Sequence, residues 1–330
     1  MSQRSLTNGL LPACFGALCG LLALVAIARP VFADDPSDKK EPEQNKKSRF
    51  IRVVFDETDR PTVLQTATKR YVSSDEQNAG VVVDLIGAVH VGDLSYYERL
   101  NKDFTTYDAL LYELIAPDGA KPTNRESGNR SVLSGLQNTM KDVLQLEFQL
   151  DKIDYTPENF VHADMSPEQF VKTMRTRGET PMTMFLRLFK ASAAQQRERP
   201  APQVSAIQLL GALLDPENGA LFLKRIVAAE LSEADTFLEA VNGEQGSTII
   251  TERNKVALDV LREQMEMGKK RVGIFYGSGH MRDFEERLIA DFGLKLDSVR
   301  WYDAWDLKDK KPAPKKQRKP SSRKKLKKDA

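Results

Sequence analysis

Two of the three histidines in the chain follow a glycine by three positions, directly after an apolar run. The first motif is Gly87-Ala88-Val89-His90 and the second is Gly277-Ser278-Gly279-His280. A glycine at the end of a strand lets the backbone turn and lets a ligand approach closely. Because ligand sites form at the carboxyl ends of parallel strands, the pair predicts two imidazoles at one metal or substrate site. The alternative is that both are loop histidines that cap helices.

Two imidazoles and one carboxylate would leave an open position on a divalent metal, which is the arrangement of a hydrolytic site. Glu113 is the best candidate, because it interrupts the apolar run Ala109–Ile115, where a charge needs a partner. The alternative is an exposed residue at the end of a strand. Asp164 is a further candidate acid, and the neighbouring His162 is equally a ligand or a structural residue. The chain has no His-Glu-x-x-His motif, which excludes ordinary zincin chemistry.

Arg253 lies within a predicted amphipathic helix from Thr248 to Met267. It shares one face of that helix with apolar side chains, namely Ile249, Ile250, Val256, Ala257 and Val260. An arginine in an apolar stripe must pair with a carboxylate or bind an anion, since burying it alone is costly. We predict a bidentate ion pair with Glu113. The alternative is a side chain at the edge of the stripe that reaches solvent.

The elements that must position these residues alternate between strands and helices. Strands are expected at Ile51–Phe55, Val63–Val72, Val81–Gly87, Ala109–Ile115, Arg271–Gly277 and Leu296–Tyr302. Helices are expected at Asp93–Asp103, Thr248–Met267 and Met281–Phe292. Strand, helix and strand at this spacing form a βαβ unit, which favours a parallel sheet.

The two ends of the folded region repeat the order strand, Gly-x-x-His, helix, strand. Glu113 and Asp303 each lie 23 residues after their histidine, so Asp303 is the counterpart of Glu113. We predict an α/β fold in which two pseudo-repeated units form a central sheet about a pseudo-two-fold axis. A large helical insertion at about residues 131–247 separates them. Within it, Ser166-Pro167-Glu168-Gln169 predicts a capping box, and Met182–Phe189 is apolar enough for a buried helix or a lid over a groove.

Charge is unevenly distributed, although Lys and Arg number 49 and Asp and Glu number 47. Residues 308–330 contain twelve basic and two acidic side chains, so the body is acidic and the tail is basic. An acidic body is not a DNA-binding domain, and we expect no sequence-specific nucleic-acid partner. The only cysteines are Cys14 and Cys19, which rules out a disulfide scaffold. A single long apolar run rules out a multi-pass membrane protein.

That apolar run, Leu10–Ala28, precedes Val31-Phe32-Ala33, a pattern typical of a secretory signal peptide. We predict a signal peptide at residues 1–33, a mature N-terminus at Asp34 and a periplasmic or extracellular location. The alternative is an uncleaved helix that anchors the chain in a membrane. Residues 34–49 are predicted to be a disordered spacer and residues 50–306 the folded domain. Residues 307–330 are predicted to be a disordered basic tail that either binds an anionic surface or adds only solubility.

One known family combines a Gly-x-x-His motif, a glutamate in the next strand, Glu-Arg-Asn at the start of a helix, and a second Gly-x-x-His motif. The chain has all four, with Glu252-Arg253-Asn254 as the third, and in this combination resembles the TraB/PrgY/GumN family, which includes the Tiki proteins. The similarity runs from about Val81 to Phe292. It is strong at Val83–Glu113 and Ile250–Leu288 and faint in the helical middle.

The resemblance implies an α/β fold in which the two motifs face each other. Tiki members are regarded as metal-dependent proteases, and the superfamily extends to erythromycin-esterase-like proteins. Other members are implicated in limiting peptide pheromone signalling. By position, the matching residues are His90, Glu113, Arg253 and His280, whereas His162 and Asp164 have no counterpart.

We therefore predict a secreted or periplasmic metal-dependent hydrolase, which we expect to be a peptidase acting on a peptide or protein. His90, Glu113 and His280 would hold a divalent ion such as Mn, Co or Zn. Arg253 would hold an anionic group or orient Glu113. A second hypothesis is a non-enzymatic protein that sequesters a peptide signal between the helical lid and the sheet. A third is an interaction protein whose functional part is the basic tail; the sequence does not indicate an oligomeric state.

Overall fold

The computed structural model describes residues 50–309 except for 74–78, 123–143, 181, 184–185, 188, 191–205, 216–217, 233–241 and 244. The predicted signal peptide (1–33), the spacer (34–49) and the tail from residue 310 lie outside the described residues. The packed chain continues past the predicted end at residue 306. Leu307 is fully buried, and its N–H donates to the carbonyl of Thr62 at 3.0 Å.

The strands of the described chain include all six that the sequence predicts. They are β1 (Ile51–Phe55), β2 (Pro61–Ser73), β3 (Val82–Ala88), β4 (Val91–Gly92), β5 (Ala109–Tyr112), β6 (Glu147–Phe148), β7 (Phe160–His162), β8 (Arg271–Gly277) and β9 (Leu294–Asp306). Strands β4 and β6 form a small antiparallel pair, and the others form one mixed sheet. The predicted α/β class is therefore confirmed.

The main sheet runs in the order β1-β2-β3-β8-β5-β7, and β9 also pairs with β2. Strands β3, β8, β5 and β7 are parallel to one another, whereas β2 is antiparallel to β1, β3 and β9. Strands β3 and β8 are buried at almost every position, as expected of parallel strands that are covered on both faces. The two Gly-x-x-His strands are direct neighbours, with Ala88 opposite Gly277.

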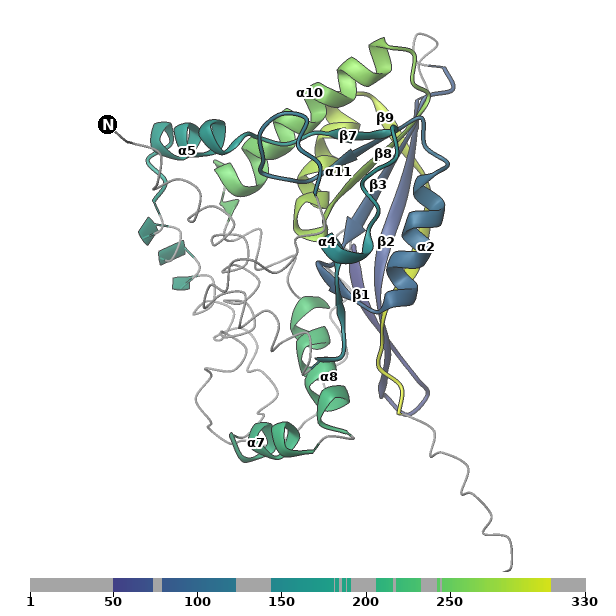
Figure 1. Ribbon diagram of the computed structural model, residues 1–330, viewed down its shortest axis with the longest axis vertical. Coiled ribbons are helices and arrows are strands. Elements are labelled where there is room, and N and C mark those ends of the chain that lie inside the picture. Colours follow the sequence, from purple (N-terminus) through teal and green to yellow (C-terminus); the bar gives the residue numbers. More distant parts are fainter. Residues whose placement is uncertain are drawn as a thin grey trace, which may run out of the picture.

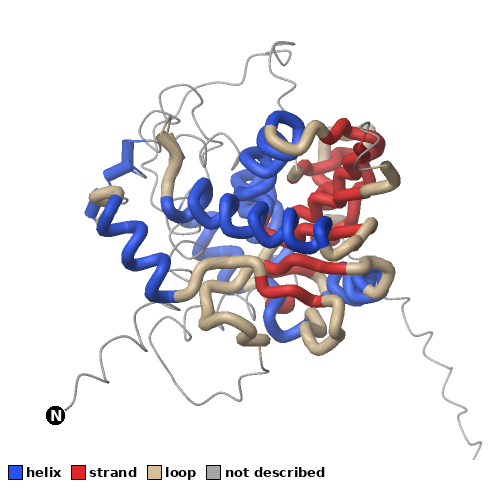
Figure 2. Tube along the Cα trace, turned by 90° about the horizontal axis from the view of Figure 1, so that it is seen from above, coloured by secondary structure: helices blue, strands red, loops and turns tan. Residues whose placement is uncertain are grey.

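Helices cover both faces of the sheet (Figures 1 and 2). The regular helices are α2 (Leu94–Phe104), α4 (Gln149–Lys152), α5 (Pro167–Thr176), α7 (Ala206–Leu214), α8 (Gly219–Ser232), α10 (Arg253–Glu266) and α11 (Met281–Ala290). Helices α2 and α8 pack on the face that contains Phe275, and α10 and α11 pack on the face that contains Ile274. Successive residues of β8 thus point into opposite core layers, as strand geometry requires.

The two predicted repeat units leave the β3–β8 pair in opposite directions. The unit β3–α2–β5 ends beyond β8, whereas β8–α11–β9 ends beyond β2, with α2 and α11 on opposite faces. Half a turn about an axis parallel to the strands would relate such units. The point between β3 and β8, where the connections diverge, is where open α/β sheets bind ligands, beyond the carboxyl ends of the strands.

The insertion between the units is less purely helical than we predicted. It contributes β7, which extends the main sheet by pairing with β5, and β6, which pairs with β4. Strands of two or three residues are too short to leave a periodic pattern. The predicted capping box is confirmed, because Gln169 N donates to Ser166 Oγ at 3.2 Å and Ser166 N donates to Gln169 Oε1 at 2.8 Å.

Two further predictions about helices need correction. The helix expected from Thr248 begins as one π-helical turn, η2 (Thr248–Glu252), and α10 starts only at Arg253. In the segment Met182–Phe189, the side chains of Met182, Leu186 and Phe189 are exposed, so the buried-helix alternative is wrong for them. None of the described helices is long and apolar enough to cross a membrane, and the run Leu10–Ala28 lies outside the described part of the chain.

Candidate functional site

Four charged or titratable side chains meet beyond the carboxyl ends of the parallel strands. His90 follows β3, Glu113 follows β5, Asp164 follows β7, and His280 ends η3 (Ser278–His280), the single 3₁₀ turn after β8. The register explains the convergence, because Ala88 of β3 and Gly277 of β8 end their strands side by side. Arg253, the first residue of α10, completes the cluster from the helical layer.

The guanidinium of Arg253 is fully buried and holds two carboxylates. Its Nε donates to Asp164 Oδ1 at 2.9 Å, and its Nη2 donates to Asp164 Oδ2 at 2.6 Å and to Glu113 Oε1 at 2.8 Å. The bidentate partner is therefore Asp164, whereas we predicted Glu113, which receives a single bond. The two carboxylates raise the pKa of Arg253 against the effect of burial, so the group stays charged. Arg253 is paired in the core, as its place in an apolar stripe predicts, and does not reach solvent.

Glu113 accepts hydrogen bonds at both oxygens. Oε1 faces Arg253, and Oε2 accepts from the backbone N–H of Gly277 at 2.7 Å. Burial alone would raise the pKa of Glu113, but Arg253, His280, His90 and the Gly277 N–H together lower it to about 2. The carboxylate is therefore ionised at neutral pH and is a fixed acceptor or ligand, with no proton to donate.

His280 is held in one tautomer by Asn254. Asn254 Nδ2 donates to the His280 carbonyl at 3.0 Å and to Asp283 Oδ2 at 2.8 Å, so Asn254 Oδ1 accepts from His280 Nδ1 at 2.7 Å. The acceptor nitrogen Nε2 then lies 3.5 Å from Glu113 Oε1 and 3.4 Å from Arg253 Nη1. Burial lowers the pKa of His280 to about 4, although Glu113 opposes the shift. The imidazole is thus neutral at pH 7, with its lone pair directed at the cluster.

His90 is oriented in the same way by Gln149, from α4. Gln149 Nε2 donates to the hydroxyl of Tyr155 at 3.1 Å, so Gln149 Oε1 accepts from His90 Nδ1 at 3.2 Å. The acceptor nitrogen of His90 is then Nε2. The ring is also held through the backbone, because Gln149 N donates to the His90 carbonyl at 2.9 Å. Each motif histidine therefore has its Nδ1 bound by an amide oxygen, which sets the Nε2 lone pair on both rings.

Gly277 creates the space in which these groups meet. A β-carbon at this position would lie 3.1 Å from His90 Nε2 and 3.3 Å from Glu113 Oε2. Two imidazole nitrogens and one carboxylate are a donor set that divalent transition metals accept, and the missing β-carbon leaves room beside two of them. Within the described ranges, no three His, Cys, Asp or Glu side chains already form a group that could hold a metal. The chemistry of these donor atoms fits a divalent ion. In the structure, Arg253 Nη1 is the group that lies beside His280 Nε2.

Two of the candidates from the sequence lie elsewhere. His162 is at the end of β7, but its Nε2 donates to the Leu114 carbonyl at 2.6 Å, which is a structural role. Asp303 belongs to β9, beside β2, and accepts from Gln65 Nε2 at 2.6 Å at the surface. The repeat suggests Asp303 as a counterpart of Glu113, but the second unit crosses two strands where the first crosses one, so its acid ends far from the cluster.

Sequence reasoning missed Gln149, Asn254 and Gly277 as parts of the site. Asn254 enters the sequence analysis only as part of the Glu-Arg-Asn motif. Its place beside an arginine that is predicted to be buried is a signal that could have indicated a residue of the site. The backbone N–H of Gly277 could have been suspected from its place as the first glycine of the motif. Gln149 gives no such signal, because it belongs to a helix of only four residues in the insertion.

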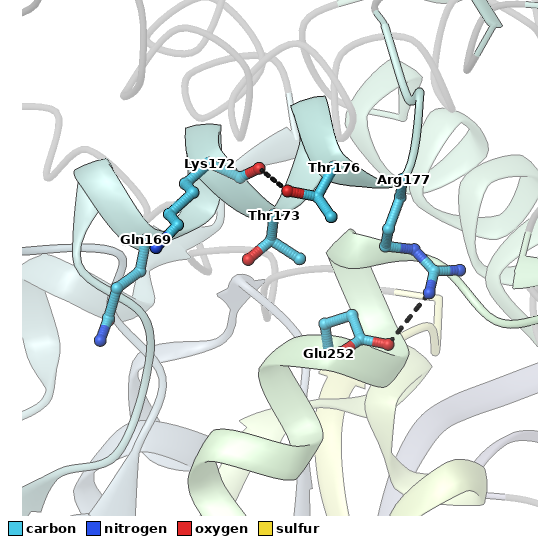
Figure 3. A pocket seen from close by; sticks show the side chains of 6 residues that line it. All are labelled: Gln169, Lys172, Thr173, Thr176, Arg177 and Glu252. Carbon is cyan, nitrogen blue, oxygen red and sulfur yellow. Dashed lines mark hydrogen bonds and ion pairs between the residues drawn. The ribbon is translucent and has the colours of Figure 1, made fainter.

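A polar groove with a volume of about 360 Å³ lies between α5 and the start of α10. Its lining comes from one face of α5 and from η2, and consists of Gln169, Lys172, Thr173, Thr176, Arg177 and Glu252 (Figure 3). Arg177 donates to Glu252 Oε1 at 3.1 Å and to the Gly246 carbonyl at 2.8 Å, which fastens α5 to the π-helical turn. Because Glu252 directly precedes Arg253, the groove and the buried cluster share the start of α10.

Comparisons of the chain with models of protein families, with curated proteins and with solved structures find no significant match. The class that the geometry itself defines is an α/β protein whose paired imidazoles and one buried carboxylate lie at the switch point of its sheet.

We expect the free energy of unfolding to fall by roughly 3 kcal/mol as the pH is lowered from 6.5 to 4. In this range the unfolded chain protonates His280 at its ordinary pKa of 6.5, while the folded chain resists until about 4. The unfolded state therefore binds more protons, and acid favours it. Glu113 continues the loss below 4.5, because its folded pKa is about 2.

Urea unfolding at a series of pH values measures this dependence. The His280→Gln variant should lose most of the slope between pH 6.5 and 4, whereas His162→Gln should keep it. Equal slopes in the wild type and His280→Gln would show that His280 is not the buried neutral group described here.

Proposed function

We propose that the chain is an exported hydrolase that cleaves peptide bonds at the His90–Glu113–His280 cluster, with a divalent ion as cofactor. One observation carries the proposal. Two imidazoles, each locked at Nδ1 by an amide oxygen, converge on one buried carboxylate at the switch point of a parallel sheet. Structural histidines need no such matched orientation, whereas ligand or base histidines do.

The protein's own groups have distinct roles in this proposal. His90, Glu113 and His280 would hold the ion, which would supply Lewis acidity and a more acidic bound water. Glu113 stays anionic through its bonds to Arg253 and Gly277, so it compensates positive charge in the site. Arg253 has no free access to solvent, and this favours the orienting role over the alternative that it binds an anionic group of the substrate. Asn254 and Gln149 accept at Nδ1, so that Nε2 is the acceptor nitrogen of each ring.

Turnover with defined metals tests the proposal. Protein purified without a polyhistidine tag is incubated with internally quenched peptides of mixed sequence, with Mn, Co or Zn added singly, and with EDTA. We expect hydrolysis that EDTA abolishes and that one of the metals restores. The Glu113→Gln variant, prepared in parallel, controls for contaminating proteases. No hydrolysis with any of the metals would contradict the proposal.

The groove between α5 and η2 favours a second candidate function, the sequestration of a peptide. Lys172, Thr173 and Gln169 present polar groups along one side of the groove, with Glu252 opposite, as a binding site for an extended chain would (Figure 3). The same peptides distinguish the two functions. Saturable binding without turnover, weakened in Lys172→Ala and unchanged in Glu113→Gln, would favour sequestration over hydrolysis.

Replacing Gly277 with alanine should weaken metal binding and activity by about 10- to 100-fold while the protein remains folded. The added β-carbon would press on His90 Nε2 at 3.1 Å and Glu113 Oε2 at 3.3 Å, so both groups must move. The φ of −53° at Gly277 suits any residue, and backbone strain is not expected. Gly211→Ala is a matched control, because its β-carbon would meet no heavy atom within 4 Å. Unchanged activity in Gly277→Ala would show that the space above this glycine is not used.

We expect the protein isolated from its host to begin at Asp34 and to be found outside the cytoplasm. The apolar run Leu10–Ala28 and the small residues before Asp34 are the reason for this prediction. Intact-mass measurement of the protein from cell fractions checks it. A mass that includes residues 1–33 would contradict cleavage and would favour the anchored form.

A further inference from the structure

A second, smaller pocket lies at the opposite end of the parallel strands from the histidine cluster, and its volume is about 190 Å³. Strand β8 begins at this pocket with Arg271 and ends beside the cluster with Gly277, so roughly 20 Å of strand separates the two. Four strands and the end of α2 contribute the lining, which consists of Thr68, Arg70, Asp84, Asp103, Thr106, Tyr107, Arg271, Ser298 and Arg300.

The strand pairing brings three arginines to this pocket. Arg70 of β2 lies opposite Asp84 of β3, and Arg300 of β9 lies opposite Thr68 of β2. Residues that face each other in antiparallel strands have β-carbons about 4.5–5.5 Å apart. Arg271 begins β8, the strand next to β3. Cationic side chains from three strands therefore converge on one small space.

Arg271 lacks an acceptor for its guanidinium. Among the residues that the structure describes, this group makes no hydrogen bond or ion pair; it lies over the ring of Tyr107, 5.0 Å from the centre, and its Nε is buried without a partner. Arg70, by contrast, donates to both oxygens of Asp84 at 2.8 Å. A buried N–H of a charged group is unfavourable without an acceptor, and guanidinium groups are well matched to carboxylates and phosphates. The space beside Arg271 therefore suits an anion.

The other two arginines also have N–H groups left for a ligand. Arg70 uses Nε and Nη2 on Asp84, and Arg300 uses Nη1 on the Tyr302 hydroxyl at 3.0 Å and on Asp103 Oδ2 at 3.5 Å. Within the described part of the chain, Arg70 Nη1 and Arg300 Nη2 have no acceptor. Three guanidinium groups and two carboxylates line the pocket, so its charge is positive by one unit even with both acids ionised.

The size and the donor directions select a phosphate group among anions. A volume of about 190 Å³ holds roughly six waters at about 30 Å³ each, and it is below the roughly 300 Å³ at which sites for drug-sized ligands begin. A planar carboxylate is satisfied by the fork of one guanidinium, whereas the oxygens of a tetrahedral phosphate accept from groups on several strands. Thr106, Ser298 and Arg300 are exposed at the rim, so an ester substituent can point to solvent.

We propose that this pocket binds a phosphate group, either as the free ion or as part of a small phosphomonoester. Arg271 is its central ligand, and Arg70 and Arg300 complete it. The proposal does not depend on the hydrolase function, because the pocket shares no residue with the histidine cluster.

Isothermal titration calorimetry tests the proposal with inorganic phosphate and, separately, with glycerol 3-phosphate. The protein has the form in which it is isolated from its host, the ionic strength is constant, and EDTA prevents binding through a metal. The test variants are Arg271→Met and Arg300→Gln. Arg262→Met is the matched control, because the Arg262 guanidinium also lies over an aromatic ring, 4.7 Å from the centre of Phe292, but outside the pocket. Lys172→Gln controls for phosphate in the groove between α5 and η2.

We expect saturable binding of phosphate by the wild type and by both controls, and binding about 10- to 100-fold weaker in Arg271→Met. Arg300→Gln should lose about 3- to 10-fold, because that side chain is 64% exposed. Without phosphate, Arg271→Met should unfold at the same urea concentration as the wild type or a higher one, and phosphate should stabilise only the wild type and the controls. Tighter binding of glycerol 3-phosphate would assign the site to an esterified phosphate, and tighter binding of inorganic phosphate would assign it to the free ion.

Three results would overturn the proposal. One is a wild type that shows no saturable binding of either compound. Another is an Arg271→Met variant that binds as tightly as the wild type, or a loss of the same size in Arg262→Met or Lys172→Gln. The third is an Arg271→Met variant that unfolds at a lower urea concentration than the wild type in the absence of phosphate, which would make Arg271 a structural residue.

Discussion

Replacing Arg253 with alanine should lower the free energy of unfolding by at least about 3–5 kcal/mol. The guanidinium is fully buried and compensates two carboxylates, with bonds of 2.6 and 2.9 Å to Asp164 and 2.8 Å to Glu113. Its removal would leave two buried negative charges without a cation, and one of them must take up a proton or the site must open. Urea unfolding at pH 7 measures the loss.

A control and a conservative variant sharpen this prediction. Arg262→Ala removes an exposed arginine of the same helix, which pairs with Asp259, and should change the free energy of unfolding by less than about 1 kcal/mol. Arg253→Lys keeps the charge but loses the planar fork that binds Asp164 at two points. We expect it to fold and to bind metal more weakly, with most of the activity lost. A loss below 1 kcal/mol in Arg253→Ala would contradict the account of a buried pair.

Replacing either motif histidine with alanine should reduce peptide hydrolysis by about 10²- to 10⁴-fold. The His90→Ala and His280→Ala variants each remove one of the two Nε2 acceptors that converge on Glu113. The fold should persist, because both residues lie beyond the ends of their strands and the sheet pairing does not depend on them. Circular dichroism checks the fold, and steady-state kinetics check the activity.

His162→Ala is the matched control for these variants. It removes the third histidine of the chain, whose Nε2 donates to the Leu114 carbonyl, and it should retain most of the activity. A His90→Ala or His280→Ala variant that keeps wild-type turnover would remove that histidine from the site. Loss of activity in all three variants, with the fold intact, would mean that the effect is not specific to the paired motifs.

The six longer strands and both Gly-x-x-His motifs were predictable because their signals are local. Runs such as Val81–Gly87 and Arg271–Gly277 are apolar at nearly every position, which is the pattern of a parallel strand covered on both faces. Placing both histidines at one edge then follows from the parallel pairing. The burial of Arg253 was predictable in the same way, from its place in an apolar helix stripe.

The partner of Arg253 was not predictable from local signals. Asp164 follows β7, a strand of three residues whose pairing with β5 depends on tertiary contacts. Without that pairing, nothing in the sequence brings Asp164 to α10. The two amides differ for the same reason. Asn254 directly follows Arg253 in the sequence, whereas Gln149 reaches His90 only through the fold of the insertion. The prediction that Asp303 is the counterpart of Glu113 is wrong. The two units repeat in sequence, but the second crosses two strands of the sheet and the first crosses only one.

Metal content is the measurement that tests the central claim most directly. Elemental analysis of protein purified without a polyhistidine tag, after equilibration with Mn, Co or Zn and removal of free ions, gives equivalents per chain. We predict one equivalent for the wild type and for His162→Ala, and a small fraction of an equivalent for His90→Ala and His280→Ala. A wild type without metal under all three conditions, or a full equivalent in either motif variant, would contradict the assignment of His90, Glu113 and His280 as a metal-dependent hydrolytic site.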